Sequence, residues 1–228
     1  MMTWALPGGD RNFPCLRGLW RRFWFPEIPP VFPREVFWVT CTSTGAMLLD
    51  GYDALRLGNE VLENLVLYFL VPLVVITWVL RRPWRDYGLT LGRWRAGLLL
   101  TALTWLVAAV LIPLSLRFDP SMRLYYSGRF LWTILASNLV DLVGWEFVFR
   151  GFLLFAYARA FGPGPALLLQ MVPFALLHIG KPALETYSTL LGGLWFGVVA
   201  WRSRSVLYPV LSHWFVSIFV VWAAAHFG

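Results

Sequence analysis

The sequence predicts an all-α integral membrane protein, a polytopic bundle of about six to eight helices. Hydrophobic residues make up 59% of the 228 residues, and charged residues only 14%, whereas a soluble domain carries about a quarter of charged residues. Apolar runs of about 20 residues, the length that crosses a bilayer, recur along most of the chain. Arginines stand in short runs beside these apolar stretches, as at positions 81–82 and 93–95, which is a juxtamembrane pattern.

The apolar runs define the individual helices. The predicted spans are 61–80, 97–116, 130–160, 165–179, 183–201 and 206–227. Segment 130–160 is long enough for a tilted or broken helix. Segment 37–55 is diluted by polar residues, so it either spans the membrane or lies at its interface. Segment 82–95 mixes arginine with aromatic residues and is predicted to lie along the membrane surface.

The chain divides into a short lead-in and one membrane domain. Residues 1–35 are rich in Pro, Arg and Trp and lack the apolar core and small-residue cleavage site of a signal peptide. We expect them to form a cytoplasmic or interfacial lead-in, and residues 36–228 to form the membrane domain.

Basic residues in the loops predict the orientation. Eight arginines would lie on one side of the membrane, at positions 81, 82, 85, 93, 95, 159, 202 and 204, against Arg117, Arg123, Arg129 and Lys181 on the other. The richer side is predicted to be cytoplasmic, and we expect a multi-pass protein of a bacterial inner membrane. The net charge of +7 forms no basic stripe on a polar domain, so nucleic acid is excluded as a partner. The oligomeric state is left open.

Polar residues inside the apolar helices are the candidates for chemistry. Glu146 and Arg150 are four residues apart, share one helix face and can pair. His178 ends the segment 165–179, and His213 shares a face of the last helix with Ser217. Ionised groups are expensive in a bilayer, so they normally face the bundle interior and one another. The three helices are therefore expected to supply a general base and hydrogen-bond donors for an oxyanion, with Arg150 orienting the carboxylate. A purely structural ion pair is the alternative for Glu146 and Arg150.

The order of these motifs resembles a known family. Glu-x-x-x-Arg-Gly at 146–151, Phe-x-x-x-His at 174–178 and His-x-x-x-polar at 213–217 are similar to the CPBP (CAAX protease and bacteriocin-processing, Abi) intramembrane proteases. The resemblance covers about residues 130–220. It implies a helical bundle with a polar cavity, and an endopeptidase that hydrolyses a peptide bond of a membrane-anchored protein with water activated by a glutamate and a histidine. By position, His178 would help to activate water and His213 would polarise the carbonyl.

The chain departs from the family pattern at two positions. The motif usually opens with two adjacent glutamates, but Trp145 occupies the first position, and Ser217 stands where an asparagine is usual. Neighbours on a helix point about 100° apart, so Glu146 does not simply replace the missing residue. Asp141 lies one turn before Trp145 and projects near it. We therefore hypothesise that Asp141 or Glu146 is the base, with a packing role as the alternative for Asp141.

The sequence also fits other functions. The missing first glutamate also fits an inactive membrane scaffold or binding subunit of the same fold. A small transporter with a proton relay is disfavoured because the sequence shows no paired repeats. Two histidines and a carboxylate can bind zinc, but the tight His-Glu-x-x-His spacing is absent. We expect no metal ion or cofactor, with zinc as the less favoured alternative. The expected partners are a membrane-anchored protein or peptide substrate and the lipid bilayer.

Overall fold

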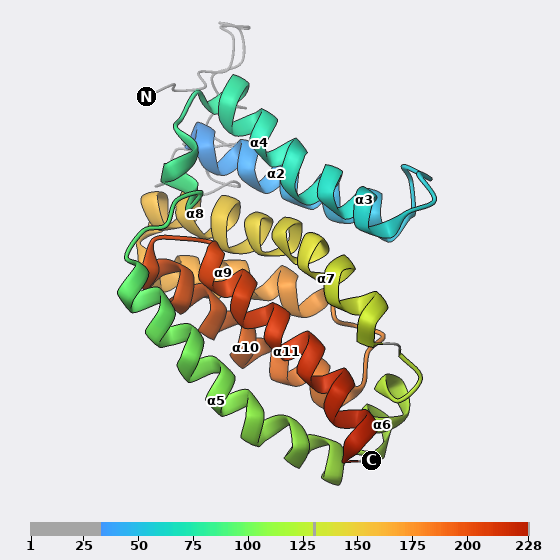
Figure 1. The fold of residues 1–228 in the computed structure, drawn as a ribbon. Coiled ribbons are helices and arrows are strands. Elements are labelled where there is room, and N and C mark those ends of the chain that lie inside the picture. The colour runs from blue at the N-terminus through green and yellow to red at the C-terminus, as the bar shows by residue number, and fades with distance from the viewer. Residues whose placement is uncertain (1–32, 130, 228) are drawn as a thin grey trace, which may run out of the picture.

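The computed structural model describes residues 33–129 and 131–227, apart from the side chains of residues 131–134, and this part of the chain is helical. It contains eight helices when contiguous segments are counted together. The fold is thus the predicted all-α bundle (Figure 1). The predicted lead-in, residues 1–35, lies outside the described residues except for its last three, and Arg34 and Glu35 already belong to the first described helix.

The first two rods of the bundle are α2 and a composite helix. α2 (Arg34–Gly51) corresponds to the predicted segment 37–55, which was expected either to span the membrane or to lie at its interface. The composite helix runs from Glu60 to Leu80 without a break and begins where the Asn59 side chain accepts a hydrogen bond from the Leu62 amide. Its successive parts are α3 (Glu60–Asn64), η1 (Leu65–Leu70), α4 (Val71–Val74) and η2 (Val75–Leu80), of which η1 and η2 are π-helical.

The remaining helices follow the predicted order with one addition. Their bounds are η3 (Trp84–Tyr87, a 3-10 turn), α5 (Trp94–Phe118), α6 (Pro120–Tyr126), α7 (Leu131–Glu146), η4 (Phe147–Leu153, π-helical), α8 (Leu154–Phe161), α9 (Pro163–Leu176), α10 (Ala183–Ser203) and α11 (Leu207–His226). α6 was not predicted. It is short and starts at an Asp119 cap, whose carboxylate accepts a hydrogen bond from the Ser121 amide at 2.9 Å.

Three described helices are long and apolar enough to cross a membrane by length and composition. They are Glu60–Leu80, Trp94–Phe118 and Leu207–His226, and Pro163–Leu176 is a shorter apolar helix. These correspond to the predicted spans 61–80, 97–116 and 206–227. Segment 130–160, predicted to be tilted or broken, is one continuous rod in which the π-helical η4 separates α7 from α8. Insertions of this kind widen a helical turn and are frequent at functional sites.

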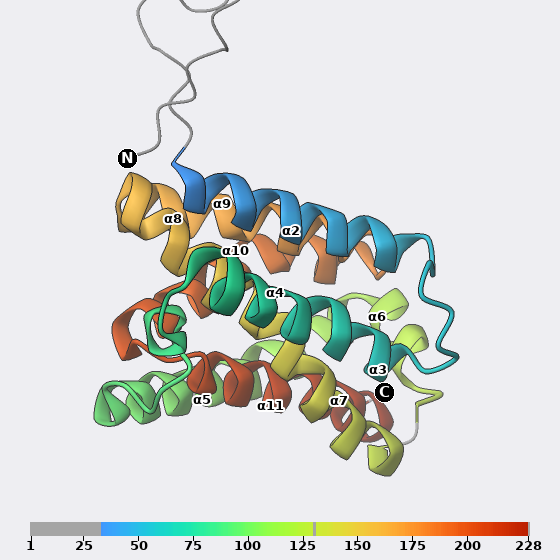
Figure 2. The same cartoon turned by 90° about the horizontal axis from the view of Figure 1, so that it is seen from above.

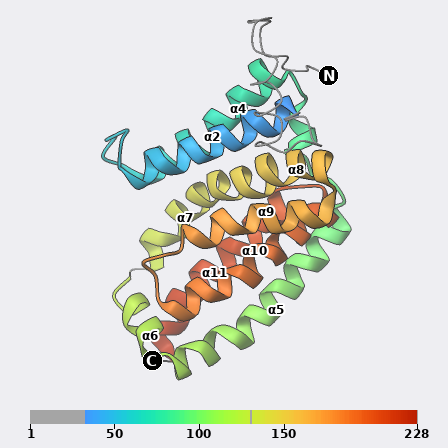
Figure 3. The ribbon, with the colours of Figure 1, turned by 180° about the vertical axis from the view of Figure 1, so that it is seen from behind.

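The α7–η4–α8 rod is the centre of the bundle. It packs against α2 and the Glu60–Leu80 rod on one side, and α8 contacts α9 while α7 contacts α11 on the other (Figures 1 and 2). From behind, α9 and α10 cover the face between α8 and α5 (Figure 3). All seven residues of η4 are buried. The segment that carries Arg150 is therefore enclosed by the bundle.

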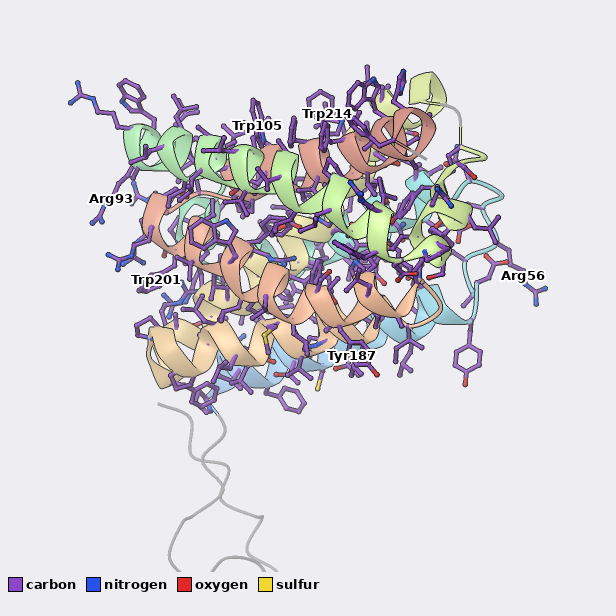
Figure 4. All side chains as sticks on the ribbon, turned by 90° about the horizontal axis from the view of Figure 1, so that it is seen from below. Arg56, Arg93, Trp105, Tyr187, Trp201 and Trp214 are labelled. Carbon is purple, nitrogen blue, oxygen red and sulfur yellow. The ribbon has the colours of Figure 1, made fainter. Side chains whose placement is uncertain are left out.

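The arginine-rich end of the bundle is held together by Glu35 of α2. Its carboxylate pairs with Arg159 at 2.5 Å and with Arg82 at 3.5 Å, and it accepts the Tyr87 hydroxyl at 2.5 Å. Burial, followed by the bond to Glu35, raises the pKa of Tyr87. Arg93 and Trp201 lie at this end, and Arg56 lies at the other (Figure 4). The clustering agrees with the predicted sidedness of the loops, and the cytoplasmic assignment of this end stays a prediction.

A glycine fixes the loop at this end against α10. Gly92 has φ of +52°, a left-handed conformation, and a Cβ added there would lie 2.1 Å from the Ser203 carbonyl oxygen. The neighbouring Arg93 amide donates to that same oxygen at 2.6 Å. Gly92→Ala is therefore expected to lower the free energy of unfolding by more than about 2 kcal/mol. Denaturant unfolding in detergent micelles measures this loss.

Gly45→Ala is the matched control for that substitution. Gly45 lies inside α2, and nothing is within 4 Å of its added Cβ, so alanine should be neutral or stabilising by up to about 1 kcal/mol. Equal effects of the two substitutions would contradict the assigned role of Gly92.

Candidate active site

A glutamate and a histidine from different helices meet inside the bundle. Glu146 Oε1, at the end of α7, lies 2.6 Å from His213 Nδ1 on α11. The Glu146 side chain is fully buried, and that of His213 is 14% exposed. The carboxylate accepts the bond, so Nδ1 carries the proton that is donated. The other ring nitrogen, Nε2, is then the position from which His213 can act on a further group.

Arg150 holds the carboxylate from the side of η4. Its Nη1 donates to Glu146 Oε1 at 3.2 Å, and both side chains are fully buried. Its Nη2 donates to the Gly193 carbonyl of α10 at 3.5 Å, and its guanidinium carbon lies 3.9 Å from the centre of the Phe174 ring. The predicted pairing of Glu146 with Arg150 is present. The guanidinium is thus held between the Glu146 carboxylate, the Gly193 carbonyl and the Phe174 ring.

His178 lies beside the Phe174 ring, which is also the ring that the Arg150 guanidinium contacts. Its Nδ1 bonds the Phe174 carbonyl at 2.8 Å, and its ring centre is 4.6 Å from that of Phe174. The His213 ring centre lies 5.8 Å from the same phenyl ring. A carbonyl only accepts, so Nδ1 of His178 is the donor and Nε2 of the neutral ring is free to accept a proton. The structure thus brings Arg150 and His213 into direct contact with Glu146, and His178 lies near the same Phe174 ring as Arg150 and His213.

Trp145 occupies the space next to His178. Its ring centre is 6.1 Å from that of His178, 5.5 Å from that of Tyr68 and 5.9 Å from that of Phe149. Its indole nitrogen is buried and has no hydrogen-bond partner among the described residues. The residue at the position of the usual first glutamate therefore faces His178, but it offers an N–H donor in place of a carboxylate.

The two remaining candidates are engaged elsewhere. Asp141 Oδ1 accepts a hydrogen bond from the Asn64 amide nitrogen at 2.8 Å, which links α7 to α3. The Ser217 hydroxyl donates to the Trp214 carbonyl of its own helix at 2.9 Å. Both contacts are those of residues that stabilise helix packing or local helix geometry.

Gln170 belongs to the surroundings of the site and was missed from the sequence. It is fully buried on α9, and its amide nitrogen donates to the carbonyls of Gly193 and Leu167, both at 2.9 Å. Gly193 is the residue whose carbonyl also receives Arg150. A glutamine inside the apolar segment 165–179 was the available signal, because a buried amide normally has a specific partner.

Unused polar atoms remain at the centre of this arrangement. Glu146 Oε2, Arg150 Nε and Trp145 Nε1 are buried, and the described part of the chain provides none of them with a hydrogen-bond partner. Buried polar groups are usually satisfied by protein, water or ligand. The carboxylate can thus accept one more hydrogen bond, as the activation of a water molecule requires.

The donor set does not suit a zinc ion. No group of three or more His, Cys, Asp or Glu side chains that could hold a metal ion is found among the described residues. The Arg150 guanidinium also lies on the Glu146 oxygen that His213 contacts, so a cation there would meet a fixed positive charge. Catalytic zinc usually takes three protein ligands, and the residues around Glu146 do not supply them.

Comparisons with known proteins find one family match. Residues 127–219 match the family model described as type II CAAX prenyl endopeptidase Rce1-like. The match covers Glu146, Arg150, His178 and His213, and it nearly coincides with the predicted range 130–220. Searches of curated proteins and of solved structures found no match. Over this segment, the chain is similar to the Rce1-like family of CAAX prenyl endopeptidases.

Proposed function

We propose that the protein is an intramembrane endopeptidase that hydrolyses a peptide bond near the membrane-anchored end of a protein substrate. The observation that carries this proposal is the 2.6 Å contact between Glu146 on α7 and His213 on α11, 67 residues apart. A carboxylate and an imidazole in direct contact, buried together and backed by a guanidinium, are the parts of an acid–base site. The substrate class in the name of the matched family, a prenylated CAAX sequence, is the first to test.

The proposed role of each residue follows from the polar atoms that the described residues leave without a hydrogen-bond partner. Glu146 Oε2 accepts a proton from a water molecule, assisted by Nε2 of His178, while the water oxygen attacks the scissile carbonyl carbon. His213, as an imidazolium stabilised by Glu146, donates from Nε2 to the oxyanion that forms. The proton taken from water then passes to the leaving amine, and the C–N bond breaks. Asp141 has no part in this scheme because its carboxylate is bonded to Asn64.

An inactive scaffold is the second candidate, and Trp145 is the observation that favours it. A glutamate is usual at this position, and here an indole lies 6.1 Å from the His178 ring. A large apolar side chain there can exclude the water that hydrolysis needs. Direct assay of cleavage separates the two candidates.

Substitution of His213 is the test of the proposal. We expect His213→Ala to lower the cleavage rate of a prenylated C-terminal reporter by about 100-fold or more, since a general acid–base or oxyanion group supplies about that much. His226→Ala is the control, because His226 is exposed on the same helix and bonds its own backbone at Trp222. If neither the wild type nor His226→Ala cleaves the reporter, the result supports the inactive scaffold.

Metal removal gives a separate prediction. Because the residues around Glu146 do not form a zinc site, the cleavage rate should survive exhaustive dialysis against a strong chelator. The rate is measured before and after dialysis, and again after zinc is added back. Loss on dialysis with recovery on zinc would overturn the metal-free scheme.

The location of the protein is also a proposal. The three apolar helices support a multi-pass membrane protein, and the arginine-rich end supports a cytoplasmic position for that end. We propose a bacterial plasma membrane with this orientation. Accessibility labelling of a cysteine introduced at Arg95, compared with one introduced at Arg123, reports the side of each end.

A further inference from the structure

A cleft at the arginine-rich end of the bundle has no part in the proposed chemistry. Its volume is about 370 Å³, and three of its lining side chains are arginines, Arg85, Arg159 and Arg204, joined by Trp201 and Asp86. Glu146 and His213 do not line it. It is therefore a separate candidate for ligand binding.

The charges around the cleft leave cations without a counter-ion. Arg159 is paired with Glu35. By contrast, Arg85, Arg93 and Arg204 form no ion pair with any carboxylate among the described residues. Arg93 lies beside the end of α10, where its amide donates to the Ser203 carbonyl, and its charge adds to burial in lowering the pKa of Arg204. An anion bound at Arg204 would offset this repulsion between cations.

The positions of the cleft walls are fixed by the backbone. The Arg93 amide donates to the Ser203 carbonyl at 2.6 Å, and the Val206 amide donates to the Gly88 carbonyl at 3.0 Å. The Arg204 guanidinium carbon stacks 3.8 Å from the centre of the Trp201 ring. Because the loop and the cation are held before a ligand arrives, binding loses little conformational entropy.

The level of the cleft relative to the bilayer indicates which kind of anion it binds. The cleft is lined by residues of η3, α8 and the end of α10. η3 lies in the loop between the Glu60–Leu80 and Trp94–Phe118 helices, and Trp84 and Trp94, at the two ends of this loop, are 50% and 54% exposed. Exposed tryptophans at helix ends mark the headgroup level of a bilayer. Basic pockets at that level bind anionic lipid headgroups, and planar guanidinium groups match phosphate geometry. We infer that this cleft binds the phosphate of an anionic phospholipid headgroup, with Arg85 and Arg204 as its principal ligands.

The test compares lipids and arginine variants on the full chain. Native mass spectrometry of the detergent-solubilised protein measures binding of phosphatidylglycerol, phosphatidylcholine and inorganic phosphate. We expect phosphatidylglycerol to bind more tightly than phosphatidylcholine. Arg85→Gln and Arg204→Gln should each weaken phosphatidylglycerol binding by about fivefold, the loss expected for one basic residue near an anionic surface.

Matched variants make the outcome decisive. Arg56→Gln removes the same charge at the opposite end of the bundle (Figure 4) and should leave phosphatidylglycerol binding unchanged. Arg204→Lys keeps the charge without the planar stack on Trp201, so it should weaken phosphatidylglycerol binding less than Arg204→Gln does. This comparison distinguishes the loss of a contact from the loss of the fold. Equal binding of the two lipids, or equal effects of Arg56→Gln and Arg204→Gln, would overturn the inference. Inorganic phosphate that displaces the lipid at equal concentration would show a soluble phosphate ligand and overturn the lipid assignment.

Discussion

Glu146→Gln is expected to lower the cleavage rate by about 1,000-fold, the size of a general base's contribution. The amide keeps the shape of the side chain but cannot accept a proton from water. It can still accept a hydrogen bond from His213, now 2.6 Å from the Glu146 oxygen, so the helices should keep their arrangement. The rate is measured with a prenylated C-terminal reporter and purified protein in micelles.

Asp141→Asn discriminates between the two carboxylates that the sequence left open as bases. Asp141 bonds Asn64 on α3, away from His213, so we expect its removal to change the rate by less than about threefold, within the range of a packing effect. A rate that falls more for Asp141→Asn than for Glu146→Gln would move the base to Asp141. The melting temperature of each variant must be measured beside its rate, so that loss of fold is not read as loss of chemistry.

Arg150→Met should be the most destabilising single substitution in the site, lowering the free energy of unfolding by about 3–5 kcal/mol. Arg150 and Glu146 are both fully buried and lie 3.2 Å apart. Methionine fills similar volume but leaves the Glu146 carboxylate without its cation inside an apolar bundle, which is the costly case. Unfolding in mixed micelles with increasing denaturant measures the loss.

A double-mutant cycle separates the ion pair from the packing of Arg150. The guanidinium also lies on the Phe174 ring at 3.9 Å and bonds the Gly193 carbonyl. If the unpaired carboxylate is the main cost, Arg150→Met combined with Glu146→Gln should be more stable than Arg150→Met alone, by more than about 1 kcal/mol. Additive effects would instead assign the stability to the aromatic and backbone contacts of Arg150.

The same two residues therefore serve stability and the proposed chemistry. Glu146 needs Arg150 to remain in the bundle and His213 to act, and both contacts use one oxygen, Oε1. This leaves Oε2 available, which is the arrangement that a base requires. The cleavage assays test whether water reaches this oxygen.

The sequence by itself determined the features that depend on neighbouring residues. The spans follow from runs of apolar residues, because burial in a bilayer needs only length and hydrophobicity. The Glu146–Arg150 pair follows from their i, i+4 spacing. The order of the motifs indicated the family whose model matches residues 127–219.

Only the tertiary structure decided how distant polar groups are paired. The sequence contains two candidate histidine partners for Glu146. The packing of α7 against α11 brings His213 into contact with it, whereas His178 lies beside Phe174. The partner of Asp141 is 77 residues away on α3, and the role of Gln170 depends on a carbonyl of α10. The physical reason is that a buried hydrogen bond depends on where two helices cross, which is set by the packing of many side chains and by no local pattern.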